Sequence, residues 1–232
     1  MEVIQNHVPF WGGVGNDFHR FCAIASNAIY LNNEESVKIL CSNRLKLSPF
    51  VARARKTIFR HKSGAAMVIH LHHPRSRRPS ALVVFRGTLV MPDYLQDIYA
   101  AFGAALPSVS ELLAWVRIQI APYTMVFFTG HSLGGFLAET LAISESRVRA
   151  CHCAAIVFNA PGPHALDHML LGIFAGGRHP PIANPRLTVI HHRIDGDPVS
   201  AIEHGVRSTT RFYEWPRVSE WSHGMSNFLS PS

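Results

Sequence analysis

The stretch of sequence that decides the fold is TMVFFTGHSLGGFLAETLAI, residues 124–143. Its first five residues form a short apolar run, which is typical of a strand buried on both faces. After Ser132, residues 133–144 have the pattern of a helix. The stretch therefore predicts a buried strand that turns into a helix within the pentapeptide Gly-His-Ser-Leu-Gly, residues 130–134.

Similar patterns lie on both sides of this unit. Four more apolar runs predict buried strands, at residues 65–71, 81–85, 153–158 and 187–192. Helices are predicted over residues 111–120 and 18–29, the latter with Asn16 or Asp17 placed to cap its start. Strands that alternate with helices predict the α/β class, with a mostly parallel central sheet flanked by helices. The first two strands are the exception, because the short polar segment HHPRSRRPS between them predicts an antiparallel hairpin.

The composition is that of a folded globular chain. Of the 232 residues, 47% are hydrophobic and 16% are charged, which excludes disorder as the general state. This length predicts one domain, over residues 1–232. Prolines and glycines interrupt the long uncharged runs, and the first 18 residues lack the continuous apolar region of a secretory signal. We therefore expect a cytoplasmic or peripherally membrane-associated protein.

Cysteine usage is sparse, with Cys22, Cys41, Cys151 and Cys153 only. A disulfide framework would need denser and more regular usage in a smaller chain. The Cys-His-Cys triplet at residues 151–153 has no second ligand pair at the spacing of a zinc site. We expect free, buried or half-buried thiols and no metal site.

The positive charge is concentrated in one segment. Residues 36–92 contain 12 of the 22 lysines and arginines and no Asp or Glu, whereas all 15 acidic residues lie elsewhere. Nucleic-acid binding is not expected, because no aromatic stacking platform or recognised motif accompanies these bases. Attraction to an anionic membrane surface, worth about 1 kcal/mol per base, is the alternative that suits a peripheral protein. A solvated basic face that protects an edge strand from pairing explains the same charges equally well.

The pentapeptide 130–134 has the form Gly-x-Ser-x-Gly. Between a buried strand and a helix, this pattern is typical of a nucleophile elbow, in which a sharp turn exposes a serine in a strained conformation. Gly130 and Gly134 would then be needed because side chains there collide across the turn. A glycine-rich turn with an ordinary serine is the simpler interpretation of the motif alone.

A serine hydroxyl needs a base to take its proton and an acid to orient that base. In this type of sheet, the expected order along the chain is Ser, then Asp or Glu after a later strand, then His. Asp195 and Asp197 follow the run 187–192, and either could serve as the acid or simply cap the turn. His223 lies near the end of the sequence, and His204 is its competitor. The order is satisfied from Ser132 onward.

The chemistry also needs two donors for a developing oxyanion. One is the backbone N–H of Leu133, and the second is expected from the loop that begins with Arg86, Gly87 and Thr88. Four motifs together resemble the class 3 lipase family of α/β hydrolases: VVFRGT, FFTGHSLGGFLA, DPVSAI and SHGMSNFL. They span residues 83–229, more than half of the chain.

The resemblance implies an α/β-hydrolase fold and a reaction that needs no cofactor. Carried over residue by residue, it implies Ser132 as nucleophile, Asp197 as acid, His223 as base, and Thr88 with Leu133 as oxyanion residues. The family's D-W-x-x-D stretch matches the sequence from Asp93 to Asp97 with Tyr in place of Trp, and we expect one of these acids to pair with Arg86. Ser200 stands where the family often has Pro.

These features predict a serine esterase or lipase that hydrolyses acylglycerols or related lipid esters through an acyl-serine intermediate. Two apolar segments, residues 89–107 and 164–174, are candidates for a mobile lid or are ordinary core-facing helices. A phospholipase or thioesterase with the same triad is an alternative. A catalytically silent module that binds a lipid or a partner is another.

Overall fold

The structure is a computed structural model, which describes residues 16–31, 51–61, 64–72, 78–87, 109–149, 151–162, 184–200 and 210–215, with Met225 and Phe228. Its elements in chain order are α1 (Asn16–Ala28), β1 (Val51–His61), β2 (Gly64–His72), β3 (Ser80–Phe85), a helix over residues 109–120, β4 (Met125–His131), α4 (Leu133–Val148), β5 (His152–Phe158), β6 (Leu187–Ile194) and β7 (Thr210–Trp215). The five strands and three helices predicted from the sequence are all present. Two strands, β1 and β7, were not predicted.

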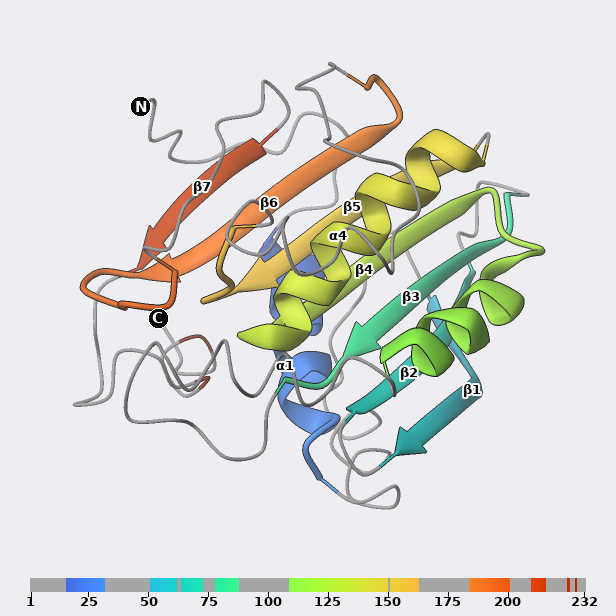
Figure 1. The fold of residues 1–232 in the computed structure, drawn as a ribbon, viewed down its shortest axis with the longest axis horizontal. Coiled ribbons are helices and arrows are strands. Elements are labelled where there is room, and N and C mark those ends of the chain that lie inside the picture. Colours follow the sequence, from blue (N-terminus) through green and yellow to red (C-terminus); the bar gives the residue numbers. More distant parts are fainter. Residues whose placement is uncertain are drawn as a thin grey trace.

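The strands form one sheet in the order β1-β2-β3-β4-β5-β6-β7 (Figure 1). β1 pairs antiparallel with β2, and β2 pairs antiparallel with β3, which confirms the predicted hairpin. From β3 to β7 every neighbouring pair is parallel. The α/β class with a mostly parallel sheet is therefore confirmed.

Helices cover both faces of this sheet. From β3 to β7, each strand lies beside the one before it, in the same direction across the sheet. Crossovers between parallel strands are right-handed, so the helices that connect these strands lie on one face. The helix over residues 109–120 and α4 occupy that face, and α1 lies on the opposite one (Figure 1). In the described part of the chain, no helix has the length and apolar character needed to cross a bilayer.

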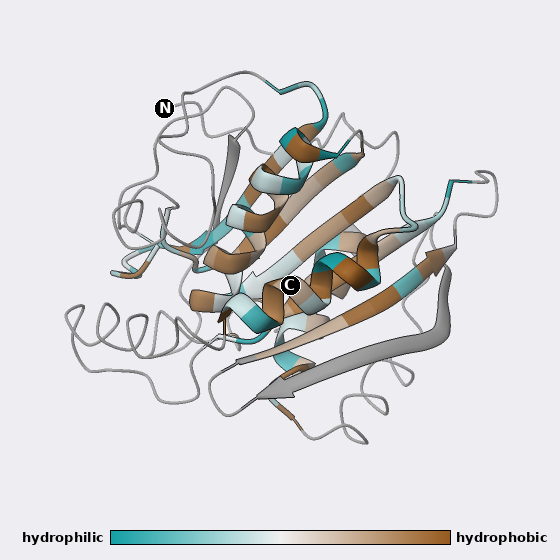
Figure 2. Cartoon of the chain, turned by 45° about the vertical axis from the view of Figure 1, so that its right-hand side comes forward, coloured by the Kyte–Doolittle hydropathy of each residue, from teal (hydrophilic) through white to brown (hydrophobic). Residues whose placement is uncertain are grey.

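The core is divided by the sheet into two layers. Along β3, Ala81, Val83 and Phe85 face the layer with α4, whereas Leu82 and Val84 face the layer with α1. All six residues of β3 are buried. In Figure 2, much of the length of the central strands has the colour of hydrophobic residues. Burial on both faces explains why the central strands are continuous apolar runs rather than alternating ones.

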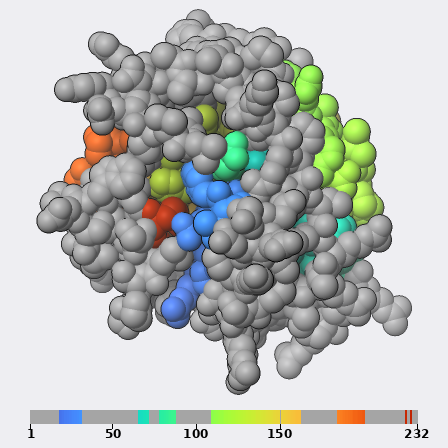
Figure 3. All heavy atoms as spheres, turned by 90° about the horizontal axis from the view of Figure 1, so that it is seen from below, coloured from blue at the N-terminus to red at the C-terminus, as the bar shows by residue number. Residues whose placement is uncertain are grey.

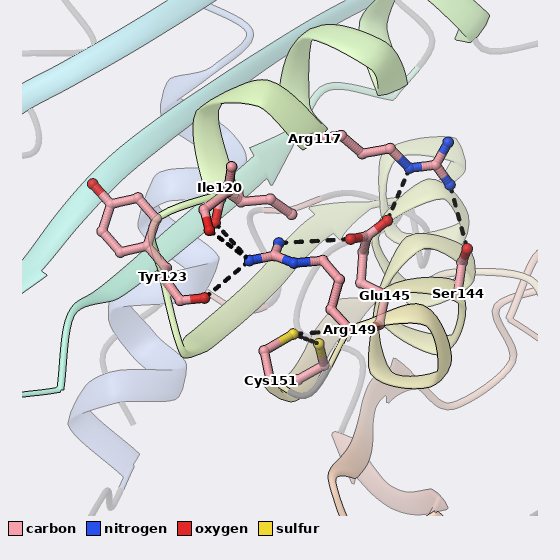
Figure 4. A network of polar contacts seen from close by, with 9 residues as sticks. Arg117, Ile120, Tyr123, Ser144, Glu145, Arg149 and Cys151 are labelled. Carbon is pink, nitrogen blue, oxygen red and sulfur yellow. Dashed lines mark hydrogen bonds and ion pairs between the residues drawn. The ribbon is translucent and has the colours of Figure 1, made fainter.

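An ion-pair network joins the ends of the two helices on the α4 face. Buried Glu145 pairs with Arg117 at 2.8 Å and with Arg149 at 3.6 Å (Figure 4). The Arg149 guanidinium also donates to the carbonyl oxygens of Ile120, Ala121 and Tyr123 at 3.0 to 3.1 Å. Here a cation stabilises the C-terminal carbonyls of the helix over residues 109–120, in accordance with the helix dipole.

Two buried histidines link α1 to β6 through the core. His192 Nε2 lies 2.9 Å from His19 Nδ1, and the His192 ring stacks on Phe158 with centroids 5.0 Å apart. Burial lowers the pKa of His19 to about 4. Burial first, and then the neighbouring His19 and His191, lower the pKa of His192 well below its usual value. Both rings are therefore neutral at pH 7.

This histidine pair predicts a loss of stability in acid. The unfolded chain binds these protons with a pKa near 6.5, so stability is full above that pH and falls as the pH drops toward 4. For His19 alone, the lowering to about 4 corresponds to about 3 kcal/mol of unfolding free energy lost at pH 4. Denaturant titrations at pH 7.5, 6 and 5 on the wild type and on His19→Gln/His192→Gln measure the effect. The double variant should show a flatter pH dependence, and identical curves would contradict the assignment.

Candidate active site

Ser132 lies at the turn between β4 and α4 and has φ 55 and ψ −127. This combination lies outside the regions that non-glycine residues normally occupy and costs about 1–3 kcal/mol. The turn is held on both sides: the Ser132 N–H donates to Phe158 O at 3.0 Å, and Ser132 O accepts the Phe136 N–H at 3.1 Å. The side chain does not cap the helix. The strained turn predicted from the pentapeptide is therefore present. The serine side chain takes no part in capping the helix.

The two outer glycines of the pentapeptide allow the turn to pack. A methyl group added to Gly130 would overlap the backbone of Gly134 across the turn. One added to Gly134 would overlap Phe85 O at the end of β3 and lie 2.8 Å from Gly87 N. A mostly parallel sheet with a strained serine between a central strand and its helix is the α/β-hydrolase fold, as predicted.

The end of β3 reaches the same turn. Gly87 leaves room for the Tyr30 hydroxyl and for His131 O, which would lie 2.5 Å and 2.7 Å from a methyl group there. The Gly87 N–H donates to Tyr30 Oη at 3.1 Å, and Tyr30 Oη lies 3.5 Å from His131 Nδ1. Burial raises the pKa of Tyr30 to about 12, so its hydroxyl stays neutral. Tyr30, two residues after α1, thus binds the residue that precedes Thr88 in the sequence. Thr88 itself lies outside the described residues.

The structure distinguishes the two candidate acids by burial. β6 ends at Ile194, and Gly196 with φ 76 allows the turn that returns the Asp197 N–H to Ile194 O at 3.1 Å. Asp195 is exposed on this turn, whereas Asp197 is 3% exposed. The Asp197 carboxylate accepts the Ser200 N–H at 2.8 Å. Asp197 is therefore held in a fixed orientation, and Asp195 faces solvent.

Ser132 and Asp197 follow strands that end at the same edge of the sheet. β4 and β6 are separated only by β5, so their ends lie about 10 Å apart at the usual strand spacing. Asn159, with φ 43, follows β5 and hydrogen-bonds the end of β6. Its N–H donates to His192 O at 2.8 Å, and its side-chain oxygen accepts the Ile194 N–H at 2.9 Å.

The histidine predicted as the base, His223, lies outside the described residues, as does its competitor His204. Met225 and Phe228 follow His223 closely in the sequence and are buried in the layer with α1. The Phe228 ring packs edge-on against Phe158, whose carbonyl oxygen holds Ser132. Figure 3 shows the described residues of the C-terminal segment (red) beside α1 (blue).

A buried contact also joins α4, which begins after Ser132, to β6, which precedes Asp197. Glu139 lies on α4, two helical turns after the serine, and its Oε2 is 3.0 Å from Nε2 of His191 on β6. Both side chains are 2% exposed. Neither this contact, nor Tyr30, nor Asn159 was identified from the sequence.

Several other expectations concern residues outside the described ranges. They are the pairing of Asp93 or Asp97 with Arg86, the two candidate lid segments, and Cys41. The remaining three cysteines are free and buried, as predicted. In the basic segment, Arg78 is exposed and Arg86 is buried. Contact of that segment with an anionic membrane stays a prediction.

No protein-family model matches the chain, and no curated protein matches its sequence. Solved structures that resemble it include a lipase from Rhizopus microsporus var. chinensis, at 13% identity and a TM-score of 0.47, over 95% of this chain and 78% of that one. The M37 lipase matches at 12% identity and a TM-score of 0.45, over 78% of this chain and 68% of that one. A Pseudomonas putida esterase matches at 10% identity and a TM-score of 0.32, over 97% and 93% of the two chains. Identities and scores this low transfer no activity to this chain.

Proposed function

We propose that this chain is a serine hydrolase of the class 3 lipase type, which cleaves carboxylic esters of acylglycerols or related lipids. The observation that carries the proposal is the backbone of Ser132, strained at φ 55 and ψ −127 between a central strand and a helix. Such strain persists only where the surrounding structure enforces it, and it is concentrated at functional sites. A glycine-rich turn with an ordinary serine would have no need for it.

In the proposed reaction, Ser132 attacks the ester carbonyl while His223 takes its proton. The acyl-serine forms as His223 returns the proton to the leaving alcohol, and water then releases the acid by the same steps. Asp197 orients His223 and stabilises its charged form. The burial of Asp197 and the fixed bond to Ser200 support this role, because they leave the carboxylate little freedom to turn away.

The developing oxyanion would lie at the first turn of α4. The N–H of Leu133 begins this helix, where the first N–H groups have no partner inside the helix and the dipole favours negative charge. Thr88 is proposed as the second donor. Support comes from its neighbour Gly87, which the Tyr30 hydroxyl and the backbone of His131 hold against the elbow.

Hydrolysis of p-nitrophenyl esters of graded chain length tests the proposed function, with Ser132→Ala as the control. We expect turnover that favours medium or long acyl chains and disappears in the variant. Because thioester and phospholipid substrates share the chemistry, they are tested in parallel to define the leaving group. A protein that binds lipid vesicles but turns over none of these substrates would be a silent binding module.

The choice of acid gives a sharper prediction. Asp197→Asn should lower kcat by about 10⁴-fold, because an amide no longer fixes the tautomer or the charge of the base. The Asn oxygen can still accept the Ser200 N–H, so the loop and the unfolding free energy should change little. Asp195→Asn, on the same turn but exposed, is the matched control and should keep activity within a few-fold. Steady-state kinetics decide; a crippled Asp195→Asn beside an active Asp197→Asn would reverse the assignment.

A further inference from the structure

A pair of thiols lies at the start of β5, at the opposite end of that strand from Ser132. Cys151 Sγ and Cys153 Sγ are 3.5 Å apart, and both cysteines are free (Figure 4). Cys153 is fully buried, and Cys151 is 3% exposed where the chain enters the strand. The ester chemistry proposed above uses neither sulfur.

The surroundings make the two thiols unequal. The Cys153 thiol contacts the Cys151 sulfur, and this hydrogen bond lowers the pKa of Cys151 below its usual value. The Arg149 guanidinium acts in the same direction, whereas burial and the Glu145 carboxylate oppose it. The pKa of Cys153 is raised, first by this hydrogen bond and then by burial. Of the two sulfurs, Cys151 is thus the one on which the thiolate, the reactive form, is favoured, with the Cys153 thiol in contact with it.

We infer that Cys151 and Cys153 are a redox-active pair that peroxides oxidise to a reversible intramolecular disulfide. The Cys151 thiolate attacks one peroxide oxygen, the O–O bond breaks, and hydroxide leaves and is protonated to water. This gives a sulfenic acid on Cys151. The Cys153 sulfur then attacks it, the S–S bond forms, the S–O bond breaks, and a second water leaves with the thiol proton. Two thiols and one hydrogen peroxide become one disulfide and two waters.

The geometry suits this step. A disulfide has an S–S bond of about 2.05 Å, so the sulfurs must approach by about 1.5 Å from their contact distance of 3.5 Å. The second thiol is already in place, so a sulfenic acid is captured before further oxidation. A dithiol reductant reverses the bond by thiol–disulfide exchange.

The simpler interpretation is that both cysteines only fill the core, since free cysteine is among the most buried residue types. The chain contains an internal control for this alternative. Cys22 is also buried and free, but burial raises its pKa, and its hydrogen-bond partner is Thr129 rather than a thiol. If burial alone decides reactivity, Cys22 and the pair should behave alike.

Peptide mapping of the native protein tests the inference. Trypsin releases residues 150–178 as one peptide with both cysteines of the pair, whereas residues 21–38 contain only Cys22. After hydrogen peroxide and then iodoacetamide under denaturing conditions, peptide 150–178 should be two hydrogens lighter and carry no alkyl group. Dithiothreitol before alkylation should restore two alkyl groups, and peptide 21–38 should be alkylated throughout. Two alkylated thiols in peptide 150–178 after peroxide, or a sulfinic acid on Cys151 beside a free Cys153, would overturn the inference.

Single variants separate the two roles. Cys153→Ser removes the capturing thiol, so dimedone should trap a sulfenic acid on Cys151 in that variant and not in the wild type. Cys151→Ser should leave Cys153 reduced under the same treatment, because burial still raises the pKa of Cys153 when Cys151 is absent. Equal oxidation of Cys153 with and without Cys151 would contradict the assigned order. The wild-type mapping stands even if a variant misfolds, and hydrolysis of a small ester by the oxidised protein reports the active site independently.

Discussion

Ser132→Ala should abolish ester hydrolysis and leave the fold intact. Removal of the nucleophile from a Ser-His-Asp site lowers kcat by about 10⁶-fold, which corresponds to about 8 kcal/mol of transition-state stabilisation. The Ser132 side chain makes no capping bond to α4, so alanine removes only the reacting oxygen. We therefore expect the free energy of unfolding to change by no more than about 0.5 kcal/mol. Initial rates on a medium-chain p-nitrophenyl ester and a urea titration measure the two quantities.

Ser144→Ala is the matched control for this variant. Ser144 lies on the same helix, far along α4 from the elbow, and accepts a 3.3 Å hydrogen bond from Arg117. Its substitution should leave kcat and KM unchanged. Turnover that survives in Ser132→Ala at a tenth or more of the wild-type rate would contradict the proposed mechanism.

Gly134→Ala should destabilise the protein, although Gly to Ala in a helix ordinarily gains about 1 kcal/mol. Gly134 lies in the first turn of α4, where an added methyl group would overlap Phe85 O and lie 2.8 Å from the carbonyl carbon of Arg86. These are backbone atoms of a buried strand end and cannot rotate away. We expect a loss of about 3 kcal/mol, or about 10 °C in Tm for a chain of this size.

Gly196→Ala is the matched control for the steric argument. Gly196 has φ 76, but nothing lies within 4 Å of an added methyl group, so only backbone strain remains. That strain costs about 1 kcal/mol. Thermal unfolding of both variants should therefore rank Gly134→Ala well below Gly196→Ala. An equal or reversed ranking would show that the close approach of β3 and α4 does not limit stability.

Most of the sheet was predictable because its central strands are buried on both faces. Such strands read as continuous apolar runs, and β3 and β5 stand out in the sequence for that reason. The two unpredicted strands, β1 and β7, lie at the two ends of the strand order. β1 reads VARARKTIFRH, and its four lysines and arginines conceal the strand pattern. Charge on an edge strand discourages pairing with other chains, so the feature that protects the edge also hides it.

The strained serine turn was predictable from the sequence, but the contacts around it were not. The pentapeptide identified the strained Ser132, because Gly-x-Ser-x-Gly between an apolar strand and a helix is typical of a nucleophile elbow. Position alone left Asp195 and Asp197 equal, and only folding shows that one is exposed and the other buried. Tyr30 and the Glu139–His191 contact have no local signal, because each joins elements far apart in the chain.

Covalent labelling with a fluorophosphonate tests most directly whether Ser132 is an activated nucleophile. The native protein is treated with the probe, digested with trypsin, and sequenced by mass spectrometry across residues 118–147, which include Ser132, Ser144 and Ser146. We expect one phosphonyl group per chain, on Ser132 only, and none after denaturation. Labelling of another serine instead would contradict this role of Ser132. So would an active protein in which the probe leaves Ser132 unlabelled.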